Sequence, residues 1–153
     1  MLIREGGLDE PSVIALLRQH LDAMHQFSPE DSVHALGVER LRGPDITFVA
    51  AWDGDDLMGC GALRELDPAH GEVKSMRTAD AYLRRGVAAA IVEHLIDLAR
   101  SRGYERVSLE TGSGASFEAA HQLYARVGFV PCGPFGDYVP DEFSRYYTLD
   151  LSR

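Results

Sequence analysis

Three short apolar segments joined by two tight turns constrain the fold of this chain more than any other feature of its sequence. The segments are Ile46 to Trp52, Leu57 to Leu66 and Glu72 to Thr78. The turns between them, DGDD and DPAHG, predict that the three strands form an antiparallel meander. A helix after Tyr82 then leads to a strand at Arg106 to Thr111, which adds a βαβ unit. This order predicts a mixed, mostly antiparallel sheet.

Further helix and strand patterns lie on both sides of this central part. MLIRE predicts a first strand, and Asp9 and Pro11 open a helix with the apolar stripe Val13, Leu17, Leu21 and Met24. The stretch SPED at Ser28 has the form of a capped helix start and predicts a second helix, which Gly37 weakens. Another helix runs from Ser116 to Val127, and FVPCG and RYYTLDL supply the closing strands. We expect one α/β (α+β) domain over residues 1–153, with about six to seven strands and four helices.

Composition and charge narrow the class of protein. Of the 153 residues, 45% are hydrophobic and 25% are charged, which is typical of a soluble globular domain. The net charge of −9 argues against nucleic acid as a partner, and apolar runs such as ITFVAAW are too short to span a membrane. Cys60 and Cys132 have no metal-ligand spacing, so we interpret them as reduced thiols of a cytoplasmic protein and expect no metal. The GxxxxGK[ST], GxGxxG, HExxH and GxSxG patterns are missing.

The helix after Tyr82 has an unusual start. Its apolar stripe is regular, at Val87, Ile91, Leu95 and Leu98, and Gly103 stands where a left-handed cap ends a helix. The first turn, by contrast, is expected to carry Arg84, Arg85 and Gly86, two positive charges where the helix dipole is already positive. A bound anion would offset that cost, and a glycine-containing turn at a helix start presents free backbone N–H groups to one. A plain turn is the alternative interpretation.

A second motif, EAAHQLYARVGFVPCG, combines an amphipathic helix, a glycine stop and a strand entered through an aromatic residue. Together the two motifs resemble the signatures of the Gcn5-related N-acetyltransferase (GNAT) superfamily. Gly86 and Ala88 match its glycine and small-residue positions, and Leu123-Tyr124 with Gly128-Phe129 match its LYxxxGF pattern. The resemblance covers nearly the whole chain. It implies the GNAT fold and acetyl-CoA as cosubstrate.

The same resemblance implies which residues bind acetyl-CoA. The diphosphate is expected on the backbone amides of Arg84, Arg85, Gly86, Val87, Ala88 and Ala89. The pantetheine arm is expected to pair with the backbone of Met76, Arg77 and Thr78. Two positions depart from the family pattern. Leu83 replaces the first signature residue, and Phe117 replaces a frequent asparagine, whose contact Ser113 or Ser116 could supply.

Catalysis requires a neutral amine, and an alkylamine is only about a thousandth neutral at pH 7. Glu72, on the strand where some superfamily members carry a catalytic glutamate, is one candidate base, and period two places it with Lys74 and Met76 on one strand face. Glu110 and a chain of waters are the alternatives. Tyr124 is the candidate acid, because a phenol is protonated at pH 7 and can donate to the departing thiolate.

The acceptor pocket in this superfamily lies between the first two helices and the closing strands. That implies two groups of wall residues, which are His25, Phe27, Ser32 and His34 in the first segment, and Phe135 and Tyr138 in the second. Lys74 and Arg77 are expected on opposite strand faces, so at most one points at the acceptor. If one does, a carboxylate-bearing acceptor such as an amino acid is indicated.

We therefore expect an N-acetyltransferase that transfers the acetyl group of acetyl-CoA to a primary amine of a small molecule or amino acid. Attack by the amine is expected to be direct, within a ternary complex, because neither cysteine lies in a nucleophile motif. One alternative is acetylation of protein N-termini or lysines, and another is a non-catalytic acyl-CoA sensor. A homodimer through the C-terminal strands is a further possibility that the sequence leaves open.

Overall fold

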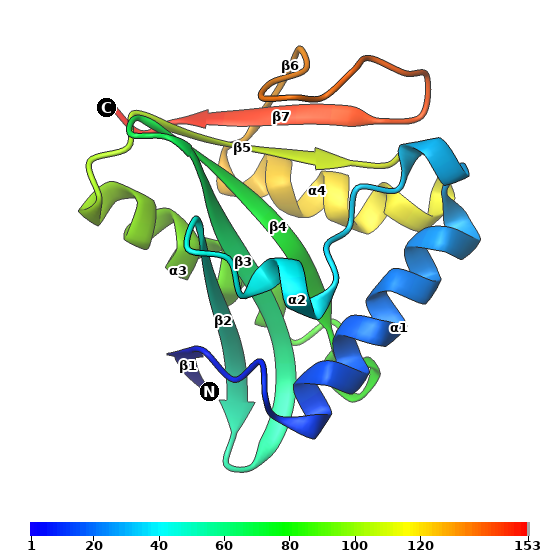
Figure 1. The fold of residues 1–153 in the computed structure, drawn as a ribbon, viewed down its shortest axis with the longest axis vertical. Coiled ribbons are helices and arrows are strands. Elements are labelled where there is room, and N and C mark those ends of the chain that lie inside the picture. Colours follow the sequence, from blue (N-terminus) through cyan, green and yellow to red (C-terminus); the bar gives the residue numbers. More distant parts are fainter. Residues whose placement is uncertain (153) are drawn as a thin grey trace.

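The predicted meander forms one half of a mixed sheet in the computed structural model, which describes residues 1–152 (Figure 1). Within those residues the sheet has seven strands in the order β1-β2-β3-β4-β5-β7-β6. The strands are β1 (Leu2–Glu5), β2 (Ile46–Asp53), β3 (Asp56–Asp67), β4 (His70–Thr78), β5 (Arg106–Thr111), β6 (Val130–Cys132) and β7 (Arg145–Asp150). Only β4 and β5 pair in parallel, so the predicted mixed, mostly antiparallel topology is confirmed.

Four α-helices cover the two faces of the sheet. They are α1 (Pro11–Phe27), α2 (Val38–Leu41), α3 (Val87–Ser101) and α4 (Glu118–Val127), with short 3₁₀ turns η1 (Glu30–Ser32), η2 (Asp80–Tyr82) and η3 (Ala115–Phe117). The apolar sides of α1 and α2 pack on one face against Phe48, Ala50, Cys60 and Ala62. On the other face α3 and α4 pack against Val49, Ala51, Leu63 and Val107. The GNAT fold expected from the sequence is thus present.

The stripe predicted for α3 faces the core. Val87, Ile91 and Leu95 are each at most 1% exposed, and Leu98 packs at the edge of the same cluster. Gly103 adopts φ of +77°, the left-handed conformation expected where this helix ends. Apolar periodicity therefore located this helix and its buried side correctly.

The prediction of a second helix starting at Ser28 is wrong in its extent. The chain forms only the 3₁₀ turn η1, and no side chain within the described residues caps that turn. An extended stretch follows, and the four-residue helix α2 begins only after Gly37. A helix-start motif is a local signal, and here Ser32 is drawn into a hydrogen bond with Asp141, 109 residues away. That tertiary contact competes with helix continuation.

The alternation predicted along β4 is also wrong beyond Lys74, because the strand contains a bulge. Ser75 has φ of +56°, and the register shifts so that Lys74 pairs with Ala62 while Arg77 pairs with Cys60. Ala62 and Cys60 both belong to the cluster under α1. Lys74 and Arg77 therefore share one face of the sheet instead of lying on opposite faces.

Met76 consequently turns to the other face, where it packs with the residues of α3. It does not share a face with Glu72 and Lys74, as strict alternation predicted. Its sulfur lies where Gly61 of β3 leaves room. The bulge therefore places the β4 side chains that follow it on the opposite face of the sheet from the one predicted.

None of the helices within residues 1–152 is long and apolar enough to cross a membrane.

Gly61 tests the packing beneath the bulge. A Cβ added there would lie 2.7 Å from Met76 Sδ and 2.8 Å from Ile91 Cγ2, which is closer than van der Waals contact allows. We expect Gly61→Ala to lower the free energy of unfolding by about 1–3 kcal/mol, measured by urea denaturation. Gly133→Ala is the control, because a Cβ at Gly133 meets nothing within 4 Å, and a loss of equal size there would contradict the packing argument.

Candidate active site

A cleft opens where β4 and β5 separate. The two strands pair only from His70 to Glu72 with Arg106 to Ser108, and their continuations diverge in a V (Figure 1). The cleft has a volume of about 680 Å³. Its walls are the end of β4, the end of β5, one side of α1 and the starts of α3 and α4. Both strands therefore turn backbone groups toward a space large enough for a ligand.

The start of α3 forms one end of this cleft. The helix begins at Val87, and its N-cap is Gly86, with φ of +81°. Arg84, Arg85 and Gly86 therefore precede the first turn, and the prediction that they form it is wrong. Within the described chain no side chain caps this end, so the N–H groups of its first turn are free. Arg84, also in the left-handed region at φ of +63°, lines the cleft beside them. Arg85 instead places its guanidinium over the ring of Tyr82, 5.4 Å from the centroid, and does not line the cleft.

These features are suited to binding an anion, which the sequence proposed for this segment. Free N–H groups at the positive end of a 15-residue helix attract negative charge, and Arg84 adds to that attraction. Ala88 and Ala89 line the cleft with the smallest side chains available there.

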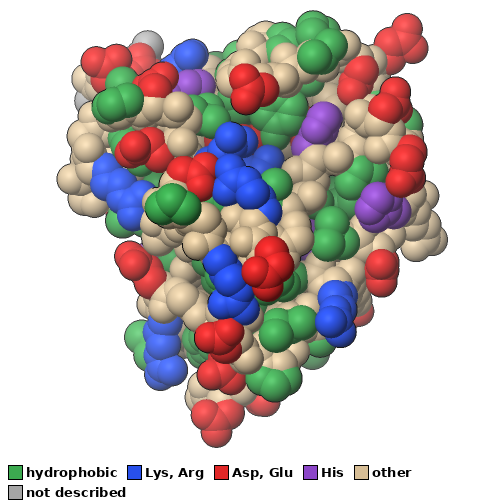
Figure 2. All heavy atoms as spheres, in the orientation of Figure 1, with side chains coloured by type: hydrophobic (Ala, Val, Ile, Leu, Met, Phe, Trp, Pro, Cys, Tyr) green, Lys and Arg blue, Asp and Glu red, His purple; other side chains and the backbone are tan. Residues whose placement is uncertain are grey.

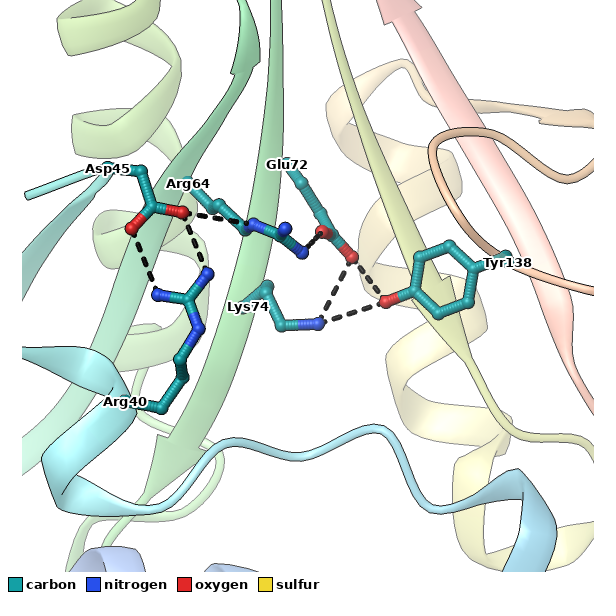
Figure 3. Close-up of polar contacts among 6 residues, drawn as sticks. All are labelled: Arg40, Asp45, Arg64, Glu72, Lys74 and Tyr138. Atoms are coloured by element: carbon teal, nitrogen blue, oxygen red, sulfur yellow. Dashed lines mark hydrogen bonds and ion pairs between the residues drawn. The ribbon is translucent and has the colours of Figure 1, made fainter. Parts of the chain in front are cut away.

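Glu72 lies at the inner end of the cleft in a buried charged cluster (Figure 3). Its side chain is 1% exposed and accepts hydrogen bonds from Lys74 Nζ, at 3.2 Å, and from the Tyr138 hydroxyl. Lys74 also donates to the Tyr138 oxygen at 2.9 Å. Burial and the charge of Glu72 raise the pKa of Tyr138, so this phenol remains a donor. The loop between β6 and β7 is thereby fastened to β4.

The cluster continues outward across the sheet to the surface (Figure 3). Arg64 Nη1 of β3 lies 3.8 Å from Glu72 Oε1, and Arg64 Nε donates to Asp45 at 3.3 Å. Arg40 of α2 forms two parallel hydrogen bonds to Asp45, of 2.9 and 2.8 Å. The Arg40 hydrogen bond holds the pKa of Asp45 at about 2. Three cations thus face two carboxylates, which leaves one positive charge in excess.

Glu110, at the end of β5, lies on the opposite wall of the cleft. Burial raises the pKa of this carboxyl to about 7, although the Ser144 side chain and the charge of Lys74 act in the lowering direction. A carboxyl with that pKa can take up and release a proton near neutral pH.

Tyr124 of α4 lines the cleft near its middle and is 6% exposed. Its ring packs against Phe129, with centroids 5.7 Å apart. Burial raises the pKa of the phenol, so the hydroxyl is protonated at neutral pH. The LYxxxGF motif therefore combines a core aromatic and a potential proton donor in one residue.

Five buried side-chain atoms have no hydrogen-bond partner within residues 1–152, and all five belong to residues that line this cleft. They are His20 Nδ1, His34 Nε2, Glu72 Oε1, Ser75 Oγ and Arg77 Nε. An unpartnered buried polar atom costs about 1–3 kcal/mol, so such a concentration in one place indicates a ligand site.

His20 was not recognised in the sequence. Burial, and then the charge of Arg77, lower its pKa to about 4, so its ring is neutral at pH 7. The available signal was a histidine at helical spacing from Val13 and Leu17, on the side of α1 that packs on the sheet. Periodicity alone cannot tell whether such a histidine is a core residue or lines a cleft.

The two predicted acceptor segments do come together. Ser32 donates a hydrogen bond of 2.8 Å to Asp141, and the rings of His34 and Tyr138 meet edge to face at 4.9 Å. Further residues that the sequence proposed for acetyl-CoA or the acceptor also line the cleft. They are Ser32, His34, Lys74, Met76, Arg77, Thr78, Ser116 and Phe117.

Four residues predicted for the acceptor pocket lie outside the cleft lining. One is Tyr138, whose hydroxyl bonds Glu72 and Lys74 instead. His25 is exposed and pairs with Glu30 at 3.3 Å, and Phe27 is 48% exposed. Phe135 packs between His70 and Tyr138 and borders a separate hollow of about 400 Å³. His25 and Phe27 belong to the last turn of α1, of which Met24 does line the cleft.

A comparison with protein families agrees with this geometry. The model of the "Acetyltransferase (GNAT) family" matches residues 13–129. The chain belongs to the GNAT family. The resemblance seen in its two motifs is thereby confirmed.

Relatives that match this GNAT chain over nearly their whole length are named as acetyltransferases. The uncharacterized N-acetyltransferase YsnE of Bacillus subtilis is 54% identical over 99% of this chain and 100% of its own. The uncharacterized N-acetyltransferase YedL of Escherichia coli is 50% identical over 97% and 94%. The IAA acetyltransferase of Azospirillum brasilense is 32% identical over 98% and 97%. The chain is therefore an acyl-CoA-dependent N-acetyltransferase.

Solved structures share the GNAT fold at lower identity. The aminoglycoside 6'-N-acetyltransferase of Enterococcus faecium superposes with a TM-score of 0.74 at 18% identity, over 100% of this chain and 98% of its own. A GNAT family acetyltransferase of Elizabethkingia anophelis with acetyl-CoA bound gives 0.73 at 15%, over 98% and 97%. At such identities the likeness concerns the fold alone.

The raised pKa of Glu110 predicts a stability effect. Between its ordinary value near 4.5 and about 7, the native carboxyl stays protonated while the unfolded one ionises, so stability falls as pH rises through this window. We expect Glu110→Gln, which resembles the protonated form, to raise the free energy of unfolding by about 1–3 kcal/mol at pH 8 and by little at pH 4. Thermal unfolding at both pH values measures the difference, with exposed Glu118→Gln as control. An equal gain at the two pH values would contradict the assignment.

Proposed function

We propose that this GNAT enzyme transfers the acetyl group of acetyl-CoA to the primary amine of a small molecule or amino acid, by direct attack in a ternary complex. The observation that carries the proposal is one continuous cleft with an anion site at its α3 end and Glu110 and Tyr124 farther along its walls. The small acceptor in the name of the Azospirillum relative supports a small-molecule substrate.

Acetyl-CoA fits the groups that the cleft offers. The free N–H groups of Val87, Ala88 and Ala89, with Arg84, would hold the diphosphate. The β4 segment Met76 to Thr78 has no strand partner on the β5 side, so its backbone can pair with the amides of the pantetheine arm. Ser116 and Phe117 border the same space from the start of α4. Leu83 is 53% exposed at the rim, where its departure from the signature removes no backbone donor.

Proton transfer is assigned to Glu110 and Tyr124. The Glu110 carboxylate takes the proton of the incoming ammonium, and the freed lone pair attacks the thioester carbonyl carbon. A C–N bond forms and the C–S bond breaks, the departing thiolate receives the Tyr124 hydroxyl proton, and the second proton of the attacking nitrogen replaces it on Tyr124, which leaves a neutral amide. A backbone N–H exposed by the separation of β4 and β5 would stabilise the oxyanion that forms between these steps.

Glu72 is a weaker candidate for the base than Glu110. Its carboxylate is 1% exposed and already accepts hydrogen bonds from Lys74 and Tyr138, with Arg64 beside it. The lone pairs of this carboxylate are therefore already engaged and are less available to an incoming ammonium. We assign Glu72 the role of a positioning residue that orients Lys74 toward the cleft.

Three further expectations stay predictions. They are a single acetyltransferase domain over residues 1–153, a cytoplasmic location and a homodimer through the C-terminal strands. The free thiols of Cys60 and Cys132 agree with a reducing compartment, and Val130 on the edge strand β6 is 56% exposed.

Tyr124→Phe tests the acid. Loss of the hydroxyl leaves the thiolate without its proton, so we expect kcat to fall by about 10²- to 10⁴-fold while the KM for acetyl-CoA changes little. The measurement is release of free CoA from acetyl-CoA with a panel of small amines, amino acids and peptides. Tyr104→Phe is the control, because that buried hydroxyl bonds Glu65 away from the cleft. Turnover of peptides alone would favour a protein acceptor, and binding without any turnover would favour a sensor.

The pH profile tests the base. Since Glu110 must be ionised to accept a proton and its pKa is about 7, kcat/KM should rise with pH up to about 7. We expect Glu110→Gln to remove this inflection and to lower kcat/KM by about 10²- to 10⁴-fold at pH 8. Glu72→Gln should weaken acceptor binding and keep the inflection. If Glu72→Gln removes it instead, Glu72 is the base.

A further inference from the structure

Lys74 and Arg77 form a pair of cations on the acceptor side of the cleft. Because of the bulge at Ser75, their register partners Ala62 and Cys60 are two residues apart on β3. The two side chains therefore start about 7 Å apart on the same face of the sheet. Both residues line the cleft, next to His20 of α1 and His34 of the segment after η1.

The fold supplies too little negative charge for this pair. In the cluster around Glu72, the cations Arg40, Arg64 and Lys74 face only the two carboxylates Asp45 and Glu72. The Lys74 side chain is 8% exposed and uses two of its three N–H groups on Glu72 and Tyr138.

Arg77 has fewer partners for its charge than Lys74 has. Its side chain takes part in none of the ion pairs within residues 1–152, and its buried Nε has no acceptor. A buried guanidinium N–H without an acceptor is costly, so an anion supplied from the cleft would be stabilised there.

The β5 wall of the cleft, which faces β4, carries an acidic group instead of cations. Glu110 lies across the cleft from β4, close enough for the charge of Lys74 to act on it. A ligand in the cleft therefore meets cations on the β4 side and a carboxyl on the β5 side. An amine with a carboxylate a few bonds away matches both walls.

We propose that the acceptor carries a carboxylate, which binds between Lys74 and Arg77 while its amine faces Glu110, so that free amino acids and similar anionic amines are the substrate class. This inference rests on the proposed function. The two oxygens of a carboxylate can accept charge-assisted hydrogen bonds from two cations on the same sheet face. A polycationic amine would instead be repelled by the same pair.

The distribution of charge on the surface supports this choice. The chain has a net charge of −9, yet Figure 2 shows basic side chains gathered over the middle of this face, with acidic side chains mostly around its edge. A local positive site within an acidic surface raises the concentration of small anions where they bind.

Matched acceptors test the carboxylate directly. CoA release would be measured at saturating acetyl-CoA with glycine, L-leucine, L-phenylalanine and L-glutamine, each beside its α-carboxamide. A charge-assisted hydrogen bond contributes about 1.5–3 kcal/mol, so we expect kcat/KM for the best acid to exceed that for its amide about 10- to 100-fold. Equal or better use of the amides would overturn the inference while leaving the acetyltransferase proposal intact.

Variants assign the preference to the two cations. In Arg77→Gln we expect the acid to lose about 10- to 100-fold in kcat/KM, mainly through KM, and the amide to be unaffected, with partial recovery in Arg77→Lys. Arg100→Gln is the control, because it removes the same charge from the exposed outer side of α3. An unchanged preference for the acid in Arg77→Gln would overturn the assigned site.

Binding of the products separates failure of this inference from failure of the proposed function. Calorimetry would compare N-acetyl-L-leucine and N-acetyl-L-phenylalanine with their carboxamides on the enzyme saturated with CoA. Tighter binding of the acids, lost in Arg77→Gln, supports the carboxylate site even if no acceptor turns over. Equal binding of acids and amides, or binding of neither, overturns it. Failure of CoA itself to bind would overturn the proposed function.

Discussion

The active site of this enzyme depends on the loss of backbone hydrogen bonding between β4 and β5 after Glu72. Backbone groups in a sheet interior are normally paired, and here a bulge at Ser75 turns the end of β4 away from its parallel neighbour. The strand stays attached to β3 throughout, so the opening does not loosen the sheet. Two unpaired strand edges thus face one cleft, at whose end α3 presents its free N–H groups.

The same bulge decides which side chains of β4 lie on each face of the sheet. Without the extra residue, Arg77 would turn toward α3 and Met76 toward α1. With it, the apolar side chain joins the core and the cation joins Lys74 in the cleft. A single residue in the left-handed region therefore determines both which backbone groups of β4 and which charges face the cleft.

Sequence patterns predicted the strands and the three longer helices, because these depend on periodicity and on local turn chemistry. The buried stripe of α3 and the position of Gly86 are examples. The bulge gave no such signal, since serine occupies the position with positive φ where glycine would have marked it. The sequence patterns also gave no indication of the long-range contacts. Ser32 bonds Asp141 across 109 residues, and Tyr138 reaches Glu72 across 66 residues.

The polar groups that make this cleft suited to a ligand also lower the stability of the fold. Five buried polar atoms of the cleft have no hydrogen-bond partner within residues 1–152, and burial raises the pKa of one carboxyl to about 7. Each of these features makes the cleft less stable than an apolar one of the same shape. The rest of the fold shows that the chain can satisfy such groups, since Asp45 is fully paired with Arg40 and Arg64. The deficit is confined to the place where the strands part. Groups left unsatisfied there discriminate strongly between ligands, because a molecule that lacks the matching group must leave them unpaired.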